Sequence, residues 1–494
     1  MLRRTTRTEA KLGEDDLKEL TQEVLTWTAQ HGLLMRMDPK EDPTEAGAGL
    51  VHVPVSLLPV MPVPRDLFDQ VCDIAKVFNT LVETVASRPQ ALKGTLALAA
   101  ANDTFTKSLV DIYNKVLSGP RPWVARRSLA INRSDYMFDE ATRSLLQVEL
   151  NTISSSFGAQ STRMAEMHEQ VLSKFHSLQQ KVDIDPLSVP YRDTIGDIVD
   201  AFAAAVREYS ERRSRESESP YDSSRNAVLM VVQDDERNIL DQQILEQALW
   251  KKHKVKTIRR TLAEIQEQGS LDEANGVFTL RGGIEVAVTY LRAGYSPLDY
   301  KTGRDYFLFL FSLPFHASLH STNTDPIITV AVLQPDVEWE ARLMLEQSQA
   351  YKCPSIAYQL VGSKKIQQYL AEENVLEEFL SNREDCDKLR KCFANLWGLD
   401  DLADVKTKEI ISHAKQNPHL YVLKPQREGG GNNLYDDELR RTLEEEQDLS
   451  AYILMQRIVS PIYRSYLLRN GKCIEEETLS ELGIYGISLY DDGR

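Results

Sequence analysis

The sequence has few cysteines, and they are not spaced for metal binding. Only 5 of the 494 residues are cysteine, and none belongs to a C-x-x-C motif. Cys386 and Cys392 are separated by five residues, a spacing that matches no zinc site. A sparse and odd set of thiols is typical of the reducing cytosol, so we expect a cytoplasmic protein whose cysteines are reduced.

Basic residues are in the minority. Lys and Arg number 58 against 74 Asp and Glu, and the formal net charge at pH 7 is −16. A nucleic-acid-binding protein usually presents a basic face, so we expect no nucleic acid partner. An anionic small molecule is still compatible with this balance, because local lysines, arginines and Mg²⁺ can reverse the sign of the potential at one site.

No apolar run is long enough to cross a membrane. The aromatic-rich stretch 306–315 contains Pro314 and is shorter than the ~20 apolar residues that a membrane span requires. Arg3, Arg4 and Arg7 give the N-terminus positive charge, but no apolar segment follows them closely. The sequence therefore predicts neither a secretory signal nor a membrane partner.

The length and the apolar periodicity predict a multidomain mixed α/β protein. A chain of 494 residues exceeds one ordinary core, so two or three domains are expected. Apolar residues at helical spacing predict helices over 15–37, 65–117 with a break near Pro89, 159–180 and 191–212. Strands are predicted over 128–135 and 146–157.

A charged, serine-rich stretch at 211–220 is the best candidate for a domain linker. Beyond it, predicted strands at 227–232, 255–259 and 282–290 alternate with helices at 238–250 and around Leu262. Such alternation is typical of a parallel sheet. The sequence thus predicts three parts: residues 1–222, a parallel-sheet α/β domain over 223–362, and residues 363–494.

The most informative stretch runs from Lys424 to Asn433 and reads K-P-Q-R-E-G-G-G-N-N. It follows the apolar run 420–423, a predicted buried strand. The lysine can bind phosphate oxygens, Glu428 can hold a hard cation, and the glycines let backbone N–H groups approach phosphates. No G-K-[ST] follows the glycines, which excludes a Walker A loop. A glycine-rich hairpin turn is the alternative.

A second candidate site is the tripeptide Glu149-Leu150-Asn151. Residues two apart on a strand project to the same face, so Glu149 and Asn151 should lie together while Leu150 points into the core. A carboxylate beside an amide oxygen suits Mg²⁺, which takes oxygen ligands. An ordinary alternating edge strand is the alternative.

Two arginines add capacity to bind anions. Arg133 precedes the Glu149 strand, and Arg292 ends a predicted strand shortly before Tyr295. Each guanidinium can clamp a carboxylate with two hydrogen bonds, although a single arginine is more often a surface residue. The small hydroxyl residues of 152–158 can present backbone donors to a carboxylate, or form a simple strand-to-helix turn.

Taken together, these segments resemble eukaryotic-type glutathione synthetases, a family of ATP-grasp ligases. The strings that carry the resemblance are V-E-L-N-T-I-S-S-S-F-G, E-R-N-I-L-D-Q, R-A-G-Y, C-P-S-I-A-Y-Q-L-V-G-S-K-K, K-P-Q-R-E-G-G-G-N-N-L-Y and S-E-L-G-I-Y-G, in the family's order. The resemblance implies an α/β (α+β) fold with an ATP-grasp core, an inserted parallel-sheet substrate-binding domain and an N-terminal helical region. It also implies a Mg²⁺-dependent homodimer that joins glycine to γ-glutamylcysteine and cleaves ATP to ADP and phosphate, giving glutathione.

The resemblance further assigns residues to three ligands. For Mg²⁺ it implies Glu149, Asn151 and Glu428. For ATP it implies Glu149, Lys364, Lys424, Pro425, Gln426, Arg427, Glu428, Gly429, Gly430, Gly431, Asn432, Asn433, Tyr435, Met455, Gln456, Arg457, Ile458 and Glu481. For the dipeptide it implies Arg133, Ile153, Ser154, Ser155, Ser156, Glu236, Arg237, Asn238, Gln242, Arg292, Ala293, Gly294 and Tyr295.

The implied chemistry needs no nucleophilic side chain. ATP converts the cysteinyl carboxylate of the dipeptide to an acyl phosphate, which the glycine amine then attacks. The protein contributes positioning and charge neutralisation. We expect Arg133 to act at the reacting carboxylate and Lys424 at the transferred phosphate, in a site closed to water.

The chain departs from the family pattern at two places. Residues of about 302–337 are inserted between P-L-D-Y and E-W-E-A-R-L, and the family continues beyond S-E-L-G with further substrate-binding, ATP-binding and lid segments. One alternative is therefore a catalytically impaired isoform that binds nucleotide or dipeptide and pairs with active chains. The other is a related ligase with a different amino acceptor, such as β-alanine.

Overall fold

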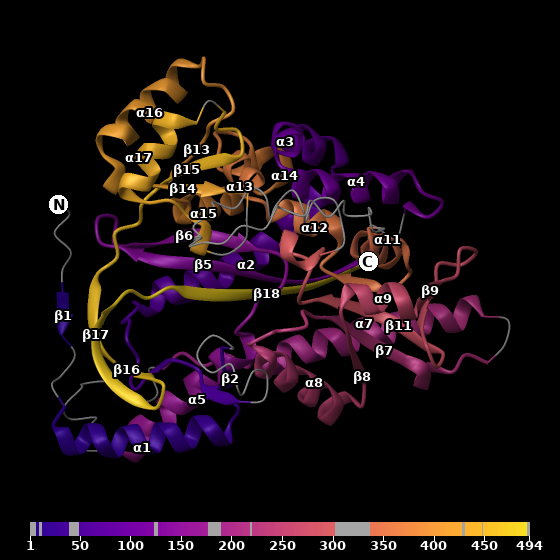
Figure 1. Ribbon diagram of the computed structural model, residues 1–494, viewed down its shortest axis with the longest axis horizontal. Coiled ribbons are helices and arrows are strands. Elements are labelled where there is room, and N and C mark those ends of the chain that lie inside the picture. The colour runs from indigo at the N-terminus through magenta and orange to yellow at the C-terminus, as the bar shows by residue number, and fades with distance from the viewer. Residues whose placement is uncertain are drawn as a thin grey trace, which may run out of the picture.

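The computed structural model describes residues 6–8, 12–38, 49–122, 127–175, 189–217, 220–301, 336–426, 430–446 and 448–491. Most of the predicted insertion, residues 302–335, lies outside the described residues, as do Arg427, Glu428 and Gly429 of the glycine-rich stretch. Figure 1 shows a long central sheet, a small sheet at the top with two helices beside it, and an α/β part at the lower right.

The described elements are mixed α and β. The helices are α1 (Glu14–Gln30), α2 (Arg65–Ala86), α3 (Pro89–Asn102), α4 (Thr104–Ser118), α5 (Gly158–Lys174), α7 (Thr194–Glu216), α8 (Ile239–His253), α9 (Leu262–Gln268), α11 (Val337–Gln347), α12 (Ile356–Val361), α13 (Lys364–Leu370), α14 (Leu376–Phe379), α15 (Arg383–Cys392), α16 (Val405–Gln416) and α17 (Asp436–Glu445). None of the helices in the described ranges combines the length and the apolarity that a membrane crossing needs.

The strands of the described ranges fall into four sheets. They are β1 (Thr6–Thr8), β2 (Leu34–Arg36), β3 (Leu50–His52), β4 (Val55–Ser56), β5 (Arg127–Asp139), β6 (Ser144–Asn151), β7 (Asn226–Val231), β8 (Lys256–Arg260), β9 (Gly269–Leu271), β10 (Phe278–Leu280), β11 (Ile284–Leu291), β12 (Tyr351–Cys353), β13 (Leu396–Gly398), β14 (Tyr421–Pro425), β15 (Tyr452–Gln456), β16 (Ile462–Arg469), β17 (Lys472–Thr478) and β18 (Leu482–Asp491).

A nine-stranded mixed sheet organises the molecule. Its main path is β18-β5-β12-β11-β10-β9, with β6 paired to β5, and with β7 paired to β11 and β8. Helices cover both faces: α7 and α8 pack against one face, and α2, α4, α11 and α12 pack against the other. Strand β7 is buried on both faces, because Leu229 and Val231 belong to one core while Val228 and Met230 belong to the other. Such two-sided burial is typical of parallel strands between helical layers.

The parallel-sheet unit predicted after the 211–220 stretch is present. Strands β7, β8 and β11 pair in parallel, and α8 connects β7 to β8. The prediction missed β9 and β10, which pair with each other in antiparallel fashion, and β10 also pairs with β11 in antiparallel fashion. The predicted linker begins inside a helix, since α7 continues to Glu216.

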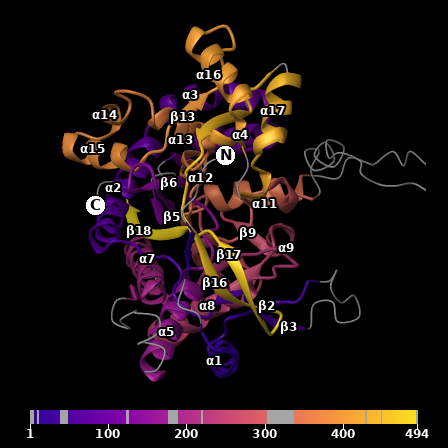
Figure 2. The ribbon, with the colours of Figure 1, turned by 90° about the vertical axis from the view of Figure 1, so that its left-hand side faces the viewer.

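Two smaller sheets flank the central one. Strands β13, β15 and β14 form an antiparallel sheet that packs with α16 and α17 around their own core, at the top of Figure 1. The hairpin β16–β17, joined by β4 and β1, reaches down toward α1 on the left of Figure 1; Figure 2 shows the same hairpin from the side. These two sheets place the C-terminal third of the chain against strands from its first third.

Several predicted boundaries need correction. The helix expected over 15–37 ends at Gln30, because Gly32 adopts a φ of +76° and residues from Leu34 form a strand. The helical region 65–117 is interrupted at Asp103 as well as near Pro89, since the Asp103 carboxylate caps α4 by accepting the Thr106 N–H. The strand expected over 146–157 ends at Asn151, and the residues after it form a turn.

Candidate active site

Strands β5 and β6 place four polar side chains on one face of the central sheet. In their antiparallel register Arg133 lies opposite Asn151, and Asp135 lies opposite Glu149. Asn151 Nδ2 donates to Asp135 Oδ2 at 2.8 Å and to Glu149 Oε1 at 3.1 Å. The prediction that Glu149 and Asn151 share a face is confirmed, and Leu150 between them is buried in the core.

Two lysines keep Glu149 ionised. Lys364, at the start of α13, donates from Nζ to Glu149 Oε2 at 2.9 Å. Burial acts to raise the pKa of Glu149, but the positive charges of Lys364 and Lys424 outweigh it and lower the pKa to about 2. The three groups come from β6, α13 and β14, so separate parts of the chain converge on one carboxylate.

Strand β14, which leads into the glycine-rich stretch, contacts β6 and the start of α13. Lys424 is buried, and its Nζ donates to the Val148 carbonyl at 2.8 Å. The side-chain oxygen of Gln426 accepts the backbone N–H of Lys365 at 3.1 Å. The beginning of the predicted phosphate cradle therefore lies directly beside the Glu149 strand.

The glycine-rich stretch connects two antiparallel segments. Gly430–Asn432 form a short 3-10 turn, after which Leu434 exchanges backbone hydrogen bonds of 2.9 and 3.1 Å with Leu423 of β14. Leu423 and Leu434 therefore pair in antiparallel fashion on either side of the stretch, and both the hairpin turn and the phosphate cradle stay predictions. Lys424, which precedes the stretch, lies close enough to Glu149 for its positive charge to lower the pKa of that carboxyl. Glu428 lies outside the described residues, so its role stays a prediction.

The segment from Met455 to Ile458 comprises the end of β15, the central strand of the small sheet, and the two residues after it. Strand β15 pairs with β14 on one side and with β13 on the other. Arg457 forms an ion pair with Asp436 at 3.1 Å, and its guanidinium lies 5.4 Å from the centre of the Tyr435 ring. Arg457 therefore contacts Tyr435 and Asp436, which follow the glycine-rich stretch.

Glu481 precedes β18 at the same cluster and is exposed to solvent. Partial desolvation, together with the negative charges of Asp135 and Glu149, raises its pKa to about 7. Three carboxylates thus approach one another, and Glu149 is the one whose charge the lysines stabilise most. A cation or a cationic group at this position would relieve the repulsion.

Arg133 is held by an acid of its own strand. Its Nε and NH2 donate to the two oxygens of Asp135 at 2.7 and 2.8 Å, and its NH1 donates to the Ser156 carbonyl at 3.1 Å. Burial opposes the charge of Arg133, but Asp135 and Tyr485 raise its pKa above the usual value. The guanidinium does clamp a carboxylate with two hydrogen bonds, as its chemistry predicts, and that carboxylate belongs to the protein.

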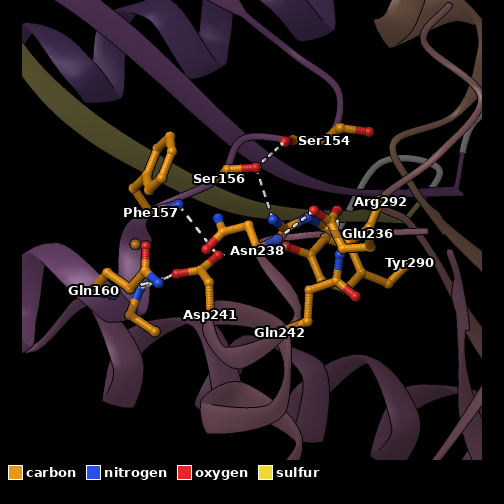
Figure 3. Close-up of polar contacts among 12 residues, drawn as sticks. Ser154, Ser156, Phe157, Gln160, Glu236, Asn238, Asp241, Gln242, Tyr290 and Arg292 are labelled. Carbon is orange, nitrogen blue, oxygen red and sulfur yellow. Dashed lines mark hydrogen bonds and ion pairs between the residues drawn. The ribbon is translucent and has the colours of Figure 1, made fainter. Parts of the chain in front are cut away.

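A second arginine is fully buried beneath the turn after β6 (Figure 3). Arg292 donates from NH1 to Asp241 Oδ2 at 3.1 Å and from NH2 to Ser156 Oγ at 2.7 Å. Asp241 also accepts the backbone N–H groups of Phe157 and Ala159, each at 3.1 Å. The backbone N–H groups that bind this carboxylate come from Phe157 and the start of α5, whereas those predicted from the hydroxyl residues before Phe157 are not among them.

The E-R-N segment supplies a second row of polar groups beside Arg292 (Figure 3). Glu236 accepts the Asn238 N–H at 2.7 Å and the Gln242 side-chain amide at 2.9 Å. Figure 3 shows Glu236, Asn238 and Gln242 grouped around Arg292 and Ser156. Arg237 makes different contacts: its side chain donates to Asp38 and to the Arg36 carbonyl, on the chain around β2.

The loop from Arg292 to Tyr295 is fixed by Asp299. The Asp299 carboxylate accepts the backbone N–H groups of Gly294, Tyr295 and Ser296 at 2.9, 3.2 and 3.2 Å. Gly294 has a φ of +95°, a conformation that favours glycine over residues with a side chain. The side chain of Gln233 donates to both Asp299 and the Tyr295 hydroxyl, so the aromatic ring is oriented as well.

The donor set around Glu149 fits a magnesium ion. Glu149 is ionised at neutral pH, and the Asn151 nitrogen is committed to two carboxylates, which leaves the amide oxygen as the atom that can bind a cation. Within the ranges that the structure describes, no three His, Cys, Asp or Glu side chains form a metal-binding group. The third expected ligand, Glu428, falls in the undescribed gap.

Sequence reasoning missed Asp135 and Asp241, although both support the expected ligand residues. Asp135 lies two residues from Arg133 and therefore on the same face of β5, a signal that was available. Asp241 lies within the E-R-N-I-L-D-Q string, one residue before Gln242. Its contact with Arg292 spans 51 residues of sequence, and no local pattern indicates it.

Comparison with known proteins gives a consistent result. A family model described as "Eukaryotic glutathione synthase, ATP binding domain" matches residues 14–494. The chloroplastic glutathione synthetase of Solanum lycopersicum is 40% identical over 96% of this chain and 77% of its own length. The glutathione synthetase of Dictyostelium discoideum is 35% identical over 96% and 91% of the two chains, and that of Homo sapiens is 34% identical over 96% and 89%.

The fold is also similar to a solved structure. A glutathione synthetase-like effector from Globodera pallida, in its apo form, superposes with a TM-score of 0.69 over 97% of this chain and 90% of the effector. The two sequences are 19% identical, so this likeness establishes the architecture alone.

Proposed function

The chain belongs to the eukaryotic glutathione synthase family and is an ATP-dependent ligase of that family; we propose that its reaction site lies on the β5–β6 face, between β14 and the turn after β6. There it joins the cysteinyl carboxylate of γ-glutamylcysteine to the amine of glycine. The observation that carries the proposal is the convergence of Lys364 and Lys424 on Glu149, since this places two cations and one ionised acid from three chain segments together.

The nucleotide end of the site comprises Glu149, Lys364, Lys424 and the glycine-rich stretch. Lys424 and Lys364 neutralise the phosphate that is transferred, because buried ammonium groups act strongly in a water-poor environment. Residues from Met455 to Ile458, with Tyr435, border the nucleotide on the far side of β14. Glu481 faces the same space from the start of β18.

Glu149 and Asn151, with Glu428, would hold Mg²⁺. Bound there, the ion supplies charge neutralisation for the terminal phosphates of ATP. The chain's own part is to keep Glu149 ionised and Asn151 oriented, and the hydrogen bonds and the lowered pKa of Glu149 provide both.

The dipeptide end comprises the turn after β6, the E-R-N segment and the loop from Arg292 to Tyr295. Arg133 lies between the two ends, since it contacts the Ser156 carbonyl on one side and Asp135 on the other. We assign it the role of binding the carboxylate that becomes the acyl phosphate. The acyl carbon then accepts the glycine nitrogen, and inorganic phosphate leaves with the electron pair of the C–O bond.

The family also suggests that the protein is a homodimer, and its reduced-type cysteine content favours the cytoplasm. Among the described residues all five cysteines are free thiols. The relatives from Solanum lycopersicum and Arabidopsis thaliana carry the description chloroplastic, so localisation of a fluorescent fusion is the direct test of the compartment. Light scattering of the purified protein tests the dimer.

The ligase proposal is tested by ADP release from the purified full chain. With ATP, Mg²⁺, γ-glutamylcysteine and glycine, we expect ADP, phosphate and glutathione in equal amounts. Replacing glycine by β-alanine tests the alternative acceptor. Nucleotide binding without any ADP release, when both amino substrates are present, would support the impaired-isoform alternative and contradict the proposal.

A further inference from the structure

Asp135 is a buried acid that touches both ends of the proposed site. It is 2% exposed, and its two oxygens accept the fork of Arg133 at 2.7 and 2.8 Å. The oxygen that binds Arg133 NH2 also accepts Asn151 Nδ2 at 2.8 Å. One carboxylate therefore sets the direction of a guanidinium and of a neighbouring amide.

The geometry determines which atoms of the two partners remain for ligands. Arg133 Nε and NH2 are both bound to Asp135. The guanidinium therefore cannot turn about its side-chain bonds without losing two charged hydrogen bonds. With its nitrogen shared between Asp135 and Glu149, Asn151 must present its oxygen as the cation-binding atom. Loss of Asp135 removes the acceptor that enforces both orientations.

Strand β18 confines this pair from the opposite side. Gly483 pairs with Asp135 in the sheet, and a Cβ atom placed on Gly483 would lie 3.0 Å from Arg133 Cδ and 3.1 Å from Asp135 Oδ1. Such distances are tighter than ordinary contacts, so any side chain at this position presses on the pair. The glycine at position 483 thus leaves space for the observed arrangement of Arg133 and Asp135.

We propose that Asp135 is a positioning residue that couples the cation site to the dipeptide site through Asn151 and Arg133. The inference rests on the proposed function, because it assigns Asn151 to the cation and Arg133 to the dipeptide. It adds a role for Asp135, a residue that is assigned neither to the cation nor to the dipeptide. Removing a residue that orients a metal-binding side chain by a hydrogen bond typically lowers the metal affinity by about 10–100-fold.

The test is calorimetric binding of Mg²⁺·ADP and, separately, of γ-glutamylcysteine to the full chain and to Asp135→Asn. We expect both affinities to fall by about tenfold or more. The control is Asp103→Asn, another buried carboxylate, which caps α4 outside the site and should leave both affinities within twofold of wild type. Unchanged binding by Asp135→Asn, or a loss confined to one ligand, overturns the coupling.

A second variant keeps the test decisive if Asp135→Asn does not fold. Gly483→Ala crowds the Arg133–Asp135 pair without removing a charge, whereas Gly486→Ala on the same strand crowds Asn79 Oδ1 at 2.7 Å. We expect Gly483→Ala to weaken both ligands and Gly486→Ala to lower thermal stability alone. Equal binding losses in the two glycine variants contradict the proposal. Failure of the wild-type chain to bind either ligand would instead refute the proposed function.

Discussion

The two ends of the site are built differently. At the dipeptide end, Arg292 and Asp241 are a closed pair with side-chain exposures of 0% and 1%, and they tie the start of α5 to β11. At the nucleotide end, Lys364 and Glu149 are 5% and 12% exposed, and the adjacent Glu481 is open to solvent. The dipeptide end is thus held by a fully buried ion pair when no ligand is bound. The nucleotide end has charged side chains that are partly exposed and that a ligand can contact.

The largest effect should come from Lys424 at the nucleotide end. Lys424→Ala removes a cation that acts on Glu149 and on the transferred phosphate, and we expect ADP release to slow by about 10²–10³-fold. Lys408→Ala, on the exposed side of α16, is the matched control and should retain the wild-type rate. If Lys424→Ala released ADP at a rate within threefold of wild type, the catalytic role assigned to the nucleotide end would be contradicted.

Asp241 should show the opposite balance, with stability affected most. Asp241→Asn breaks a fully buried ion pair and loosens three contacts of the turn, so the free energy of unfolding should fall by about 3–5 kcal/mol. Urea unfolding measures this loss. We also expect the KM for γ-glutamylcysteine to rise about tenfold, which corresponds to about 1.4 kcal/mol of binding energy.

The KM for ATP separates the two ends in the same variant. It should stay near the wild-type value in Asp241→Asn, because Asp241 makes its hydrogen bonds with the turn, α5 and Arg292. A matched rise in both KM values would show that the ends are not separate.

The pH dependence of the free energy of unfolding should reflect the titration of Glu481 at the nucleotide end. In the folded protein the pKa of Glu481 is raised from its ordinary value of 4.5 to about 7, so the folded ligand-free protein binds an extra proton between these values. Its contribution to stability is complete below pH 4.5 and is lost as pH rises to 7. Glu481→Gln should flatten this part of the thermal stability profile; an unaltered slope would rule out the assignment.

The smallest effect is expected at Arg457. Its ion pair with Asp436 is partly exposed, with side-chain values of 26% and 55%, and such pairs contribute about 0–1 kcal/mol. Arg457→Ala should therefore change the free energy of unfolding by less than about 1 kcal/mol. A larger loss in urea unfolding would mean that this side of the nucleotide end is as rigid as the dipeptide end.

The sequence predicts the parts of the site that depend on local pattern. The two-residue period of a strand places Glu149 beside Asn151, and alternating strands and helices predict the parallel pairing of β7, β8 and β11. It does not predict cross-strand register, and so Asp135 opposite Glu149 was missed. Nor does it indicate burial of Arg292, because that burial depends on the ion pair with Asp241 of α8, which lies 51 residues away in the sequence.

The most direct measurement of the central claim is the Mg²⁺-dependent release of ADP by the full chain when γ-glutamylcysteine and glycine are added together. The account predicts one ADP for each glutathione formed. It also predicts loss of this activity in Glu149→Gln, because the native carboxylate accepts a hydrogen bond from Lys364 and lies close to the charge of Lys424. Undiminished ligation by a folded Glu149→Gln protein would contradict it.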